Sequence, residues 1–91
     1  MNAPATATVA QVLVVDDEPG LRTLYELTLV REGYHVESGA TLAEAWQQLE
    51  ERRFDAVITD MRLPDGLGLE LLQRMLADQR SGRCIVMTAH G

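Results

Sequence analysis

The chain has 91 residues, of which 46% are hydrophobic, and a formal net charge of −6. These values predict a single globular domain with a real core, and they argue against a disordered chain or a nucleic-acid-binding segment, which needs a basic face. One cysteine and no apolar run long enough to span a bilayer exclude an internal disulfide and a membrane span, and favour a reducing cytoplasm. All eight basic residues are arginine, so the chain contains no lysine.

Residues 1–10 are predicted to be a flexible N-terminal tail, because they lack the basic start and long apolar stretch of a signal peptide. Residues 11–15 form a continuous β-branched run, typical of a strand buried on both faces of a parallel sheet. A helix is expected from Pro19 to about Glu32, since proline suits the first turn. Its predicted inward stripe consists of Leu21, Leu24, Tyr25 and Thr28.

Residues 34–38 alternate between apolar and polar side chains, which predicts a half-exposed strand at a sheet edge. A capping-box pattern at residues 41–44 then starts a second helix. Its apolar positions have helical spacing and include Trp46, which is predicted to belong to the core rather than to a stacking platform. The charged run at 50–53 is interpreted as a solvated helix end.

A third strand at residues 55–59 ends in Asp60 and is followed by a loop containing Pro64 and Gly66. A third helix is expected over residues 67–78, and a fourth strand over 83–87. The third helix is predicted to place Leu69, Leu72 and Leu76 on one face. Strands that alternate with helices favour an α/β fold with a flavodoxin-like doubly wound parallel sheet in strand order 2-1-3-4.

This strand order brings the carboxyl ends of strands 1, 3 and 4 together, with Asp16 and Asp17, then Asp60, then Thr88. Carboxylates this close repel one another unless a cation compensates them, and Mg²⁺ is the natural candidate because it prefers oxygen ligands. The opposing interpretation is that Asp16 and Asp17 only cap the first helix and that Thr88 only ends a strand.

Three motifs identify a family resemblance: Val12–Pro19, Ile58–Gly66 and Val86–Gly91. The chain resembles the receiver domain of two-component response regulators. The amino-acid sequence of its second and third motifs is similar to that of receivers in nitrogen-regulator-type transcriptional activators. The resemblance covers nearly all of residues 11–91. It implies a phosphoacceptor signalling module, rather than an enzyme, that takes a phosphoryl group from a sensor histidine kinase and relays a conformational change to an attached or partner output domain.

The resemblance also implies roles for individual residues. Asp60 is the phosphoacceptor, while Asp16, Asp17, Asp60 and the backbone carbonyl of Arg62 hold Mg²⁺. These acids and this carbonyl are the expected metal-binding set.

Residues at the end of the fourth strand are expected to sense the phosphoryl group. Thr88 contacts it as a switch, and Ala89 is small enough to leave the acceptor accessible. Arg62 and His90 occupy positions whose side chains tune loss of the phosphoryl group in this family.

The sequence departs from the family pattern because the last third of a receiver domain has no counterpart in it. The fourth helix, fifth strand, fifth helix and phosphate-contacting lysine of a receiver have no counterpart in the 91 residues. We therefore expect an incomplete receiver that phosphorylates poorly. We also expect strand 83–87 to be an exposed edge that promotes self-association.

Two other functions are considered. The first is a phosphorylation-independent protein-interaction domain with a vestigial pocket, favoured only by the absent lysine. The second is a Mg²⁺-dependent phosphatase of the haloacid-dehalogenase type, which places Asp-x-Asp at the end of strand 1, whereas Asp16 and Asp17 are adjacent here. A dinucleotide site is excluded because acids replace the glycine-rich turn that pyrophosphate requires.

Overall fold

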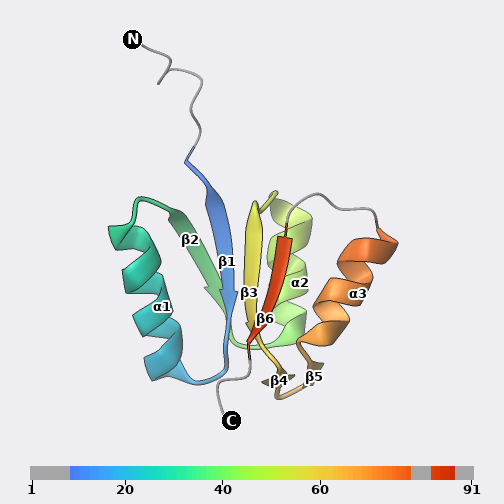
Figure 1. Ribbon diagram of the computed structural model, residues 1–91. Helices are drawn as coiled ribbons and strands as arrows, with labels where there is room; N and C mark the ends of the chain where they lie inside the picture. The colour runs from blue at the N-terminus through green and yellow to red at the C-terminus, as the bar shows by residue number, and fades with distance from the viewer. Residues whose placement is uncertain (1–8, 79–82, 88–91) are drawn as a thin grey trace.

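The computed structural model describes residues 9–78 and 83–87, the latter as backbone. Its main sheet contains β1 (Gln11–Val15), β2 (His35–Gly39), β3 (Ala56–Asp60) and β6 (Arg83–Met87). All neighbouring strands pair in parallel in the order β2-β1-β3-β6 (Figure 1), which confirms the predicted strand order 2-1-3-4 and the flavodoxin-like fold class.

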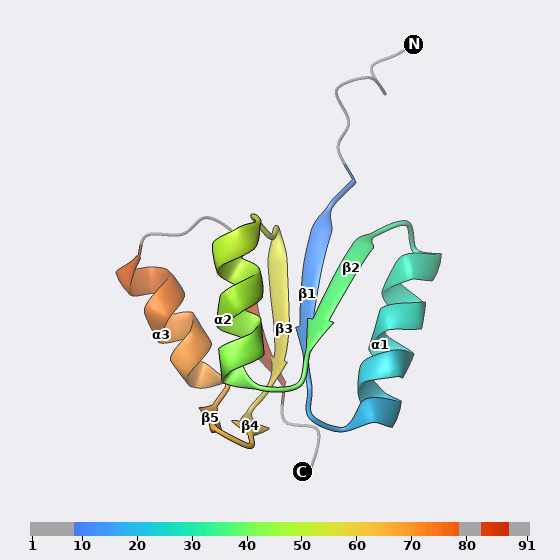
Figure 2. The same ribbon diagram turned by 180° about the vertical axis from the view of Figure 1, so that it is seen from behind.

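Three helices connect these strands: α1 (Pro19–Arg31), α2 (Leu42–Glu51) and α3 (Leu69–Ala77). From β1 the chain first crosses to β2 at one edge of the sheet. It then returns past β1 to β3 and continues to β6 at the other end of the strand order. Right-handed crossovers therefore place α1 on one face of the sheet and α2 and α3 on the other. The two opposite views agree with this arrangement (Figures 1 and 2).

A short antiparallel hairpin was not predicted. It consists of β4 (Arg62–Leu63) and β5 (Gly66–Leu67), where only a loop was expected. Figure 2 shows it at the carboxyl edge of the sheet, beside the first turns of α2 and α3. The hairpin has only two residue pairs, which is too short to give a periodic pattern in the sequence. The sequence therefore showed only the turn residues Pro64 and Gly66, which predicted a loop.

The main core lies between the sheet and the pair α2 and α3. It is formed by buried apolar side chains from β1, β3, β4, these helices and the segment between α2 and β3: Leu13, Val15, Ala45, Leu49, Phe54, Val57, Leu63, Leu71 and Met75. Trp46 packs half-buried against this cluster, as predicted, and the guanidinium of Arg74 lies 3.8 Å from its ring centroid. Val12 and Val14 are buried on the opposite face, so β1 is covered on both sides.

The apolar faces predicted for two helices are only partly buried, since Leu21, Tyr25 and Leu72 are half-buried. In α3 the buried residues are Leu71 and Met75, whereas Leu69 and Leu76 are 42% and 69% exposed. Apolar residues occur on both sides of this helix, so their spacing alone does not choose the packed side. In α1 no residue is fully buried, and Leu24, predicted to face inward, is 55% exposed.

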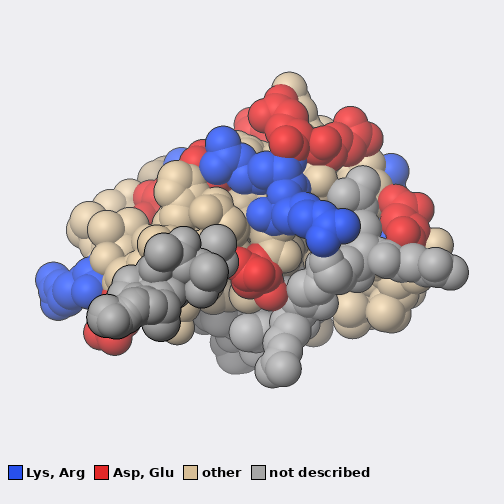
Figure 3. All heavy atoms as spheres, turned by 90° about the horizontal axis from the view of Figure 1, so that it is seen from above, with Lys and Arg blue, Asp and Glu red and all other residues tan. Residues whose placement is uncertain are grey.

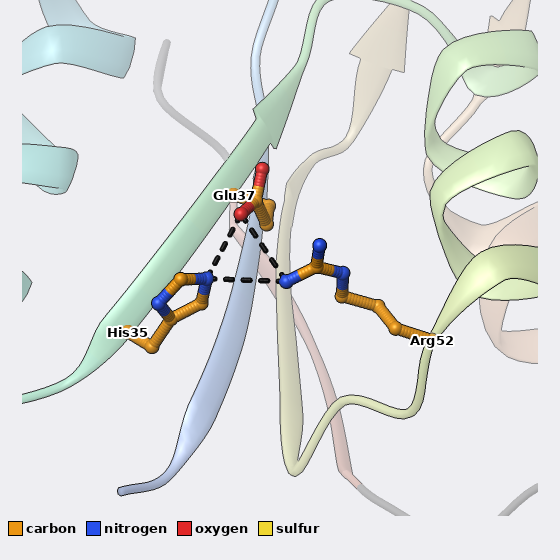
Figure 4. Close-up of polar contacts among 3 residues, drawn as sticks. All are labelled: His35, Glu37 and Arg52. Carbon is orange, nitrogen blue, oxygen red and sulfur yellow. Dashed lines mark hydrogen bonds and ion pairs between the residues drawn. The ribbon is translucent and has the colours of Figure 1, made fainter.

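The amino edge of the sheet carries mixed charge. Arginine and carboxylate side chains lie beside one another on the described part of this face (Figure 3). One cluster joins β2 to the end of α2: Glu37 accepts from His35 at 2.8 Å and pairs with Arg52 at 3.3 Å (Figure 4). Its members are partly exposed, so the cluster contributes roughly 1 kcal/mol or less to stability. Among the described helices, none is long and apolar enough to cross a membrane.

Candidate functional site

Three carboxylates meet at the carboxyl edge of the sheet. Asp16 and Asp17 follow β1, and Asp60 is the last residue of β3, the neighbouring strand. Each offers one oxygen, and these oxygens all lie within 4.8 Å of one another. Asp16 and Asp60 are 2% and 8% exposed, while Asp17 is open to solvent. The sheet therefore brings together the three acids predicted from the strand order.

Asp16 is fixed by its surroundings. Its backbone N–H donates to the carbonyl of Gly39 on β2 at 3.0 Å, and its own carbonyl accepts from Nη1 of Arg22 on α1 at 2.8 Å. Its carboxylate accepts from the N–H of Glu18 at 2.9 Å. The N-cap of α1 is Glu18, whose carboxylate accepts from the N–H groups of Gly20 and Leu21. The helix is therefore capped by Glu18, and the alternative that Asp16 and Asp17 serve only as its cap is not supported.

The electrostatics of the group favour a cation. Burial raises the pKa of Asp16 above its usual value, and the charges of Asp60 and Asp17 add to this, while the hydrogen bond from Glu18 opposes it. Octahedral Mg²⁺ with bonds of about 2.0–2.1 Å spaces its oxygen ligands about 3–4 Å apart. Carboxylate oxygens already within 4.8 Å fit this donor set with small side-chain adjustments.

The backbone after Asp60 is tightly enclosed. The N–H of Gly68 donates to the carbonyl of Met61 at 2.7 Å, which closes the base of the β4–β5 hairpin. Gly68 itself packs against the Asp60 carbonyl and the side chain of Thr59, leaving no room for a β-carbon. Leu63 anchors the hairpin in the core at 8% exposure.

The tip of the hairpin contacts α2. The carboxylate of Asp65 accepts from the N–H of Leu42 at 2.8 Å and from that of Ala43 at 3.1 Å. These two bonds lower the pKa of Asp65, although burial opposes them, so the carboxylate is charged at neutral pH. The predicted capping box of α2 is also present in part: the Thr41 hydroxyl accepts from the N–H of Glu44, but the Glu44 carboxylate accepts from Ala40 instead of Thr41.

The remaining predicted site residues have different outcomes. Arg62, whose carbonyl was expected to bind the metal, begins β4 directly beyond the acidic group and has an exposed side chain. Thr88, Ala89 and His90 lie outside the described residues. Sequence reasoning gave no role to Arg22 or to the side chain of Asp65. Asp65 has no local signal, because it reaches a helix 22 and 23 residues away, and Arg22 binds a backbone carbonyl, which no side-chain pattern marks.

The fold and the acidic group define a doubly wound α/β domain with a candidate divalent-metal centre at the carboxyl edge of its sheet. A family model described as the response regulator receiver domain matches residues 12–91. The chain belongs to this family.

Relatives and solved structures agree with this assignment. The chain is 41% identical over 81 residues to the response regulator protein PilR of Pseudomonas aeruginosa, and 34% identical over 80 residues to the DNA-binding transcriptional regulator NtrC of Azospirillum brasilense. These alignments cover 89% and 88% of the chain but only 18% and 17% of the relatives. The resemblance to nitrogen-regulator-type activators is thereby confirmed, and the chain spans less than a fifth of these proteins.

Among solved structures, the fold is similar to the response regulator TrrA of Thermotoga maritima, determined in complex with Mg²⁺ and beryllium fluoride. The TM-score is 0.84 at 31% identity, covering 91% of this chain and 72% of TrrA. A second structure shows TrrA in complex with the histidine kinase ThkA, and there the TM-score is 0.83 with the same identity and coverage.

Proposed function

We propose that this domain is the phosphoacceptor module of a two-component response regulator and that Asp60 takes the phosphoryl group. The observation that carries the proposal is the meeting of Asp16, Asp17 and Asp60 within 4.8 Å at the end of adjacent central strands. In the proposed site, Asp16, Asp17, Asp60 and the carbonyl of Arg62 hold Mg²⁺, which would neutralise charge as the phosphoryl group arrives.

The proposed transfer starts from a phosphohistidine of a sensor kinase. A carboxylate oxygen of Asp60 attacks phosphorus, the phosphorus–nitrogen bond breaks, and the histidine leaves with the electron pair of that bond. Asp60 is mostly enclosed, so attack is limited to its exposed edge. Arg22 and the N–H of Glu18 hold the Asp16 loop during the transfer. Thr88 and Ala89 are proposed to sense the product, and Arg62 and His90 to tune its hydrolysis.

The partners follow from the same proposal. The kinase complex of TrrA supports a histidine kinase as phosphodonor, and the similarity to NtrC supports a transcriptional output domain. The domain acts as a signalling module in the cytoplasm, without catalytic turnover of a separate substrate.

The proposal predicts which carboxylate becomes phosphorylated. With Mg²⁺ and a small phosphodonor such as acetyl phosphate, intact-protein mass spectrometry should show one added phosphoryl group on a fraction of the wild type, because phosphorylation is expected to be slow, and none on Asp60→Asn. Asp55→Asn is the matched control, because Asp55 lies just before the other end of the same strand, where its carboxylate accepts from the N–H of Gln11. Equal labelling of Asp60→Asn and the wild type would refute the assignment.

We also propose that the exposed edge of β6 promotes self-association. Within the described residues, β6 pairs with β3 alone, and a strand edge without a partner can pair with another chain. Sedimentation equilibrium should show an average mass that rises with protein concentration. A constant monomer mass over the same range, together with cooperative melting, would contradict this proposal.

A further inference from the structure

The β4–β5 hairpin links the acidic group to α2. It starts two residues after Asp60, and its base is closed by the bond from the N–H of Gly68 to the carbonyl of Met61. The N–H of Leu67 also donates to the carboxylate of Glu70 on α3 at 2.9 Å. The base of the hairpin is therefore held to the end of β3 and to the start of α3.

The tip of the hairpin is held separately. Asp65 lies in the turn between β4 and β5, and its carboxylate accepts hydrogen bonds from the N–H groups of Leu42 and Ala43. A β-carbon at neighbouring Gly66 would stand 2.6 Å from Cδ1 of Leu42, which shows how closely the tip lies against α2. The helix in turn is anchored in the core by Ala45 and Leu49, which are 0% and 4% exposed.

Asp65 is not the only cap of α2. The Thr41 hydroxyl accepts from the N–H of Glu44, and the Thr41 carbonyl accepts from that of Ala45. The first N–H groups of this helix are exposed and water can satisfy them, so capping alone does not require a carboxylate from a distant loop. What Asp65 adds is position, because it fixes the tip of the hairpin relative to the core.

We infer that Asp65 is a positioning residue for the metal centre: by tying the hairpin tip to α2, it holds the Arg62 backbone where its carbonyl can join Asp16, Asp17 and Asp60. The inference rests on the proposed function, since it assumes that the acidic group binds Mg²⁺. Arg62 lies between the end of β3 and Leu63, which is buried in the core, and Asp65 holds the turn beyond Leu63 against α2.

The test compares three variants with the wild type. Asp65→Ala removes the tether, and its dissociation constant for Mg²⁺, followed by amide chemical shifts, should rise about 10-fold, as for other residues that orient metal ligands. Thr41→Ala removes the other side-chain cap of α2 but leaves the hairpin tied, so its affinity should stay within about twofold of the wild type, even if its melting temperature falls similarly. Asp65→Asn removes the same charge but keeps an oxygen that can accept from Leu42, and it should retain most of the affinity.

The outcomes separate the possible explanations. If Asp65→Ala and Thr41→Ala bind Mg²⁺ equally well, the positioning role is wrong. If Asp65→Asn loses as much affinity as Asp65→Ala, the effect comes from charge, and the positioning role is again wrong. A wild-type protein that binds no Mg²⁺ would refute the proposed function itself, whereas wild-type binding that is insensitive to Asp65→Ala would refute only this inference.

Discussion

Replacing Gly68 with alanine is expected to lower the free energy of unfolding by about 3 kcal/mol, near the upper end of the usual cost of overpacking. The added β-carbon would overlap the carbonyl oxygen of Asp60 and stand 2.8 Å from Oγ1 of Thr59. Both neighbours belong to β3 and are buried, so neither can move without disturbing the central strand. Urea unfolding followed by circular dichroism measures the change.

Gly20→Ala is the matched control for this prediction. Its β-carbon would meet only the capping carboxylate of Glu18, at 3.1 Å, in the first turn of α1, and a shift of a few tenths of an ångström relieves this contact. Alanine there should leave stability unchanged or raise it by about 0.5–1 kcal/mol, because it restricts the unfolded chain more than glycine does. If Gly68→Ala is as stable as Gly20→Ala, the close packing described around Asp60 is wrong.

The substitution Asp16→Asn is expected to stabilise the metal-free protein and abolish its response to Mg²⁺. Asp16 is buried beside two other carboxylates, and removing its charge relieves repulsion of about 1–2 kcal/mol, given that close charges interact by about 1 kcal/mol in water and more at a protein surface. The asparagine oxygen can still accept from the N–H of Glu18. Wild-type protein should gain about 1.4 kcal/mol at a Mg²⁺ concentration ten times the dissociation constant, and the variant should gain almost none.

The pH dependence gives this prediction a second readout. Because the pKa of Asp16 is raised above 3.8 in the folded protein, the folded state holds its proton more strongly than the unfolded state. Metal-free stability should therefore fall as the pH rises from about 3.8 through the folded pKa, and Asp16→Asn should lack this contribution. Glu50→Gln changes net charge equally at an exposed position on α2 and should keep the wild-type response to Mg²⁺. A metal-free Asp16→Asn less stable than the wild type would contradict the account of repulsion.

The sheet and the position of its acids were predictable because their signals are local. The central strands β1 and β3 are short apolar runs, and Asp16 and Asp60 stand where these two runs end. Right-handed crossovers then leave few possible strand orders, so the meeting of the acids follows from general rules of α/β folds. The predicted edge strand at 34–38 is shifted by one residue in the structure, to His35–Gly39.

The inward faces of α1 and α3 and the link through Asp65 were not predictable in the same way. Apolar side chains of α3 fall on both sides, and contact with the sheet selects Leu71 and Met75. The bonds of Asp65 join residues that are 22 and 23 positions apart, so only the folded arrangement of the hairpin and α2 reveals them. Long-range polar contacts of this kind leave no periodic pattern in a single sequence.

The measurement that tests the central claim most directly is Mg²⁺-dependent binding of beryllofluoride, a phosphoryl analogue, to the wild type and to Asp60→Asn. Fluorescence of Trp46, which packs against the core behind the sheet, and amide shifts of residues 56–68 can report binding. The account predicts saturable binding to the wild type that requires Mg²⁺ and is lost in Asp60→Asn. Absence of binding to the wild type, or unchanged binding in Asp60→Asn, would contradict it.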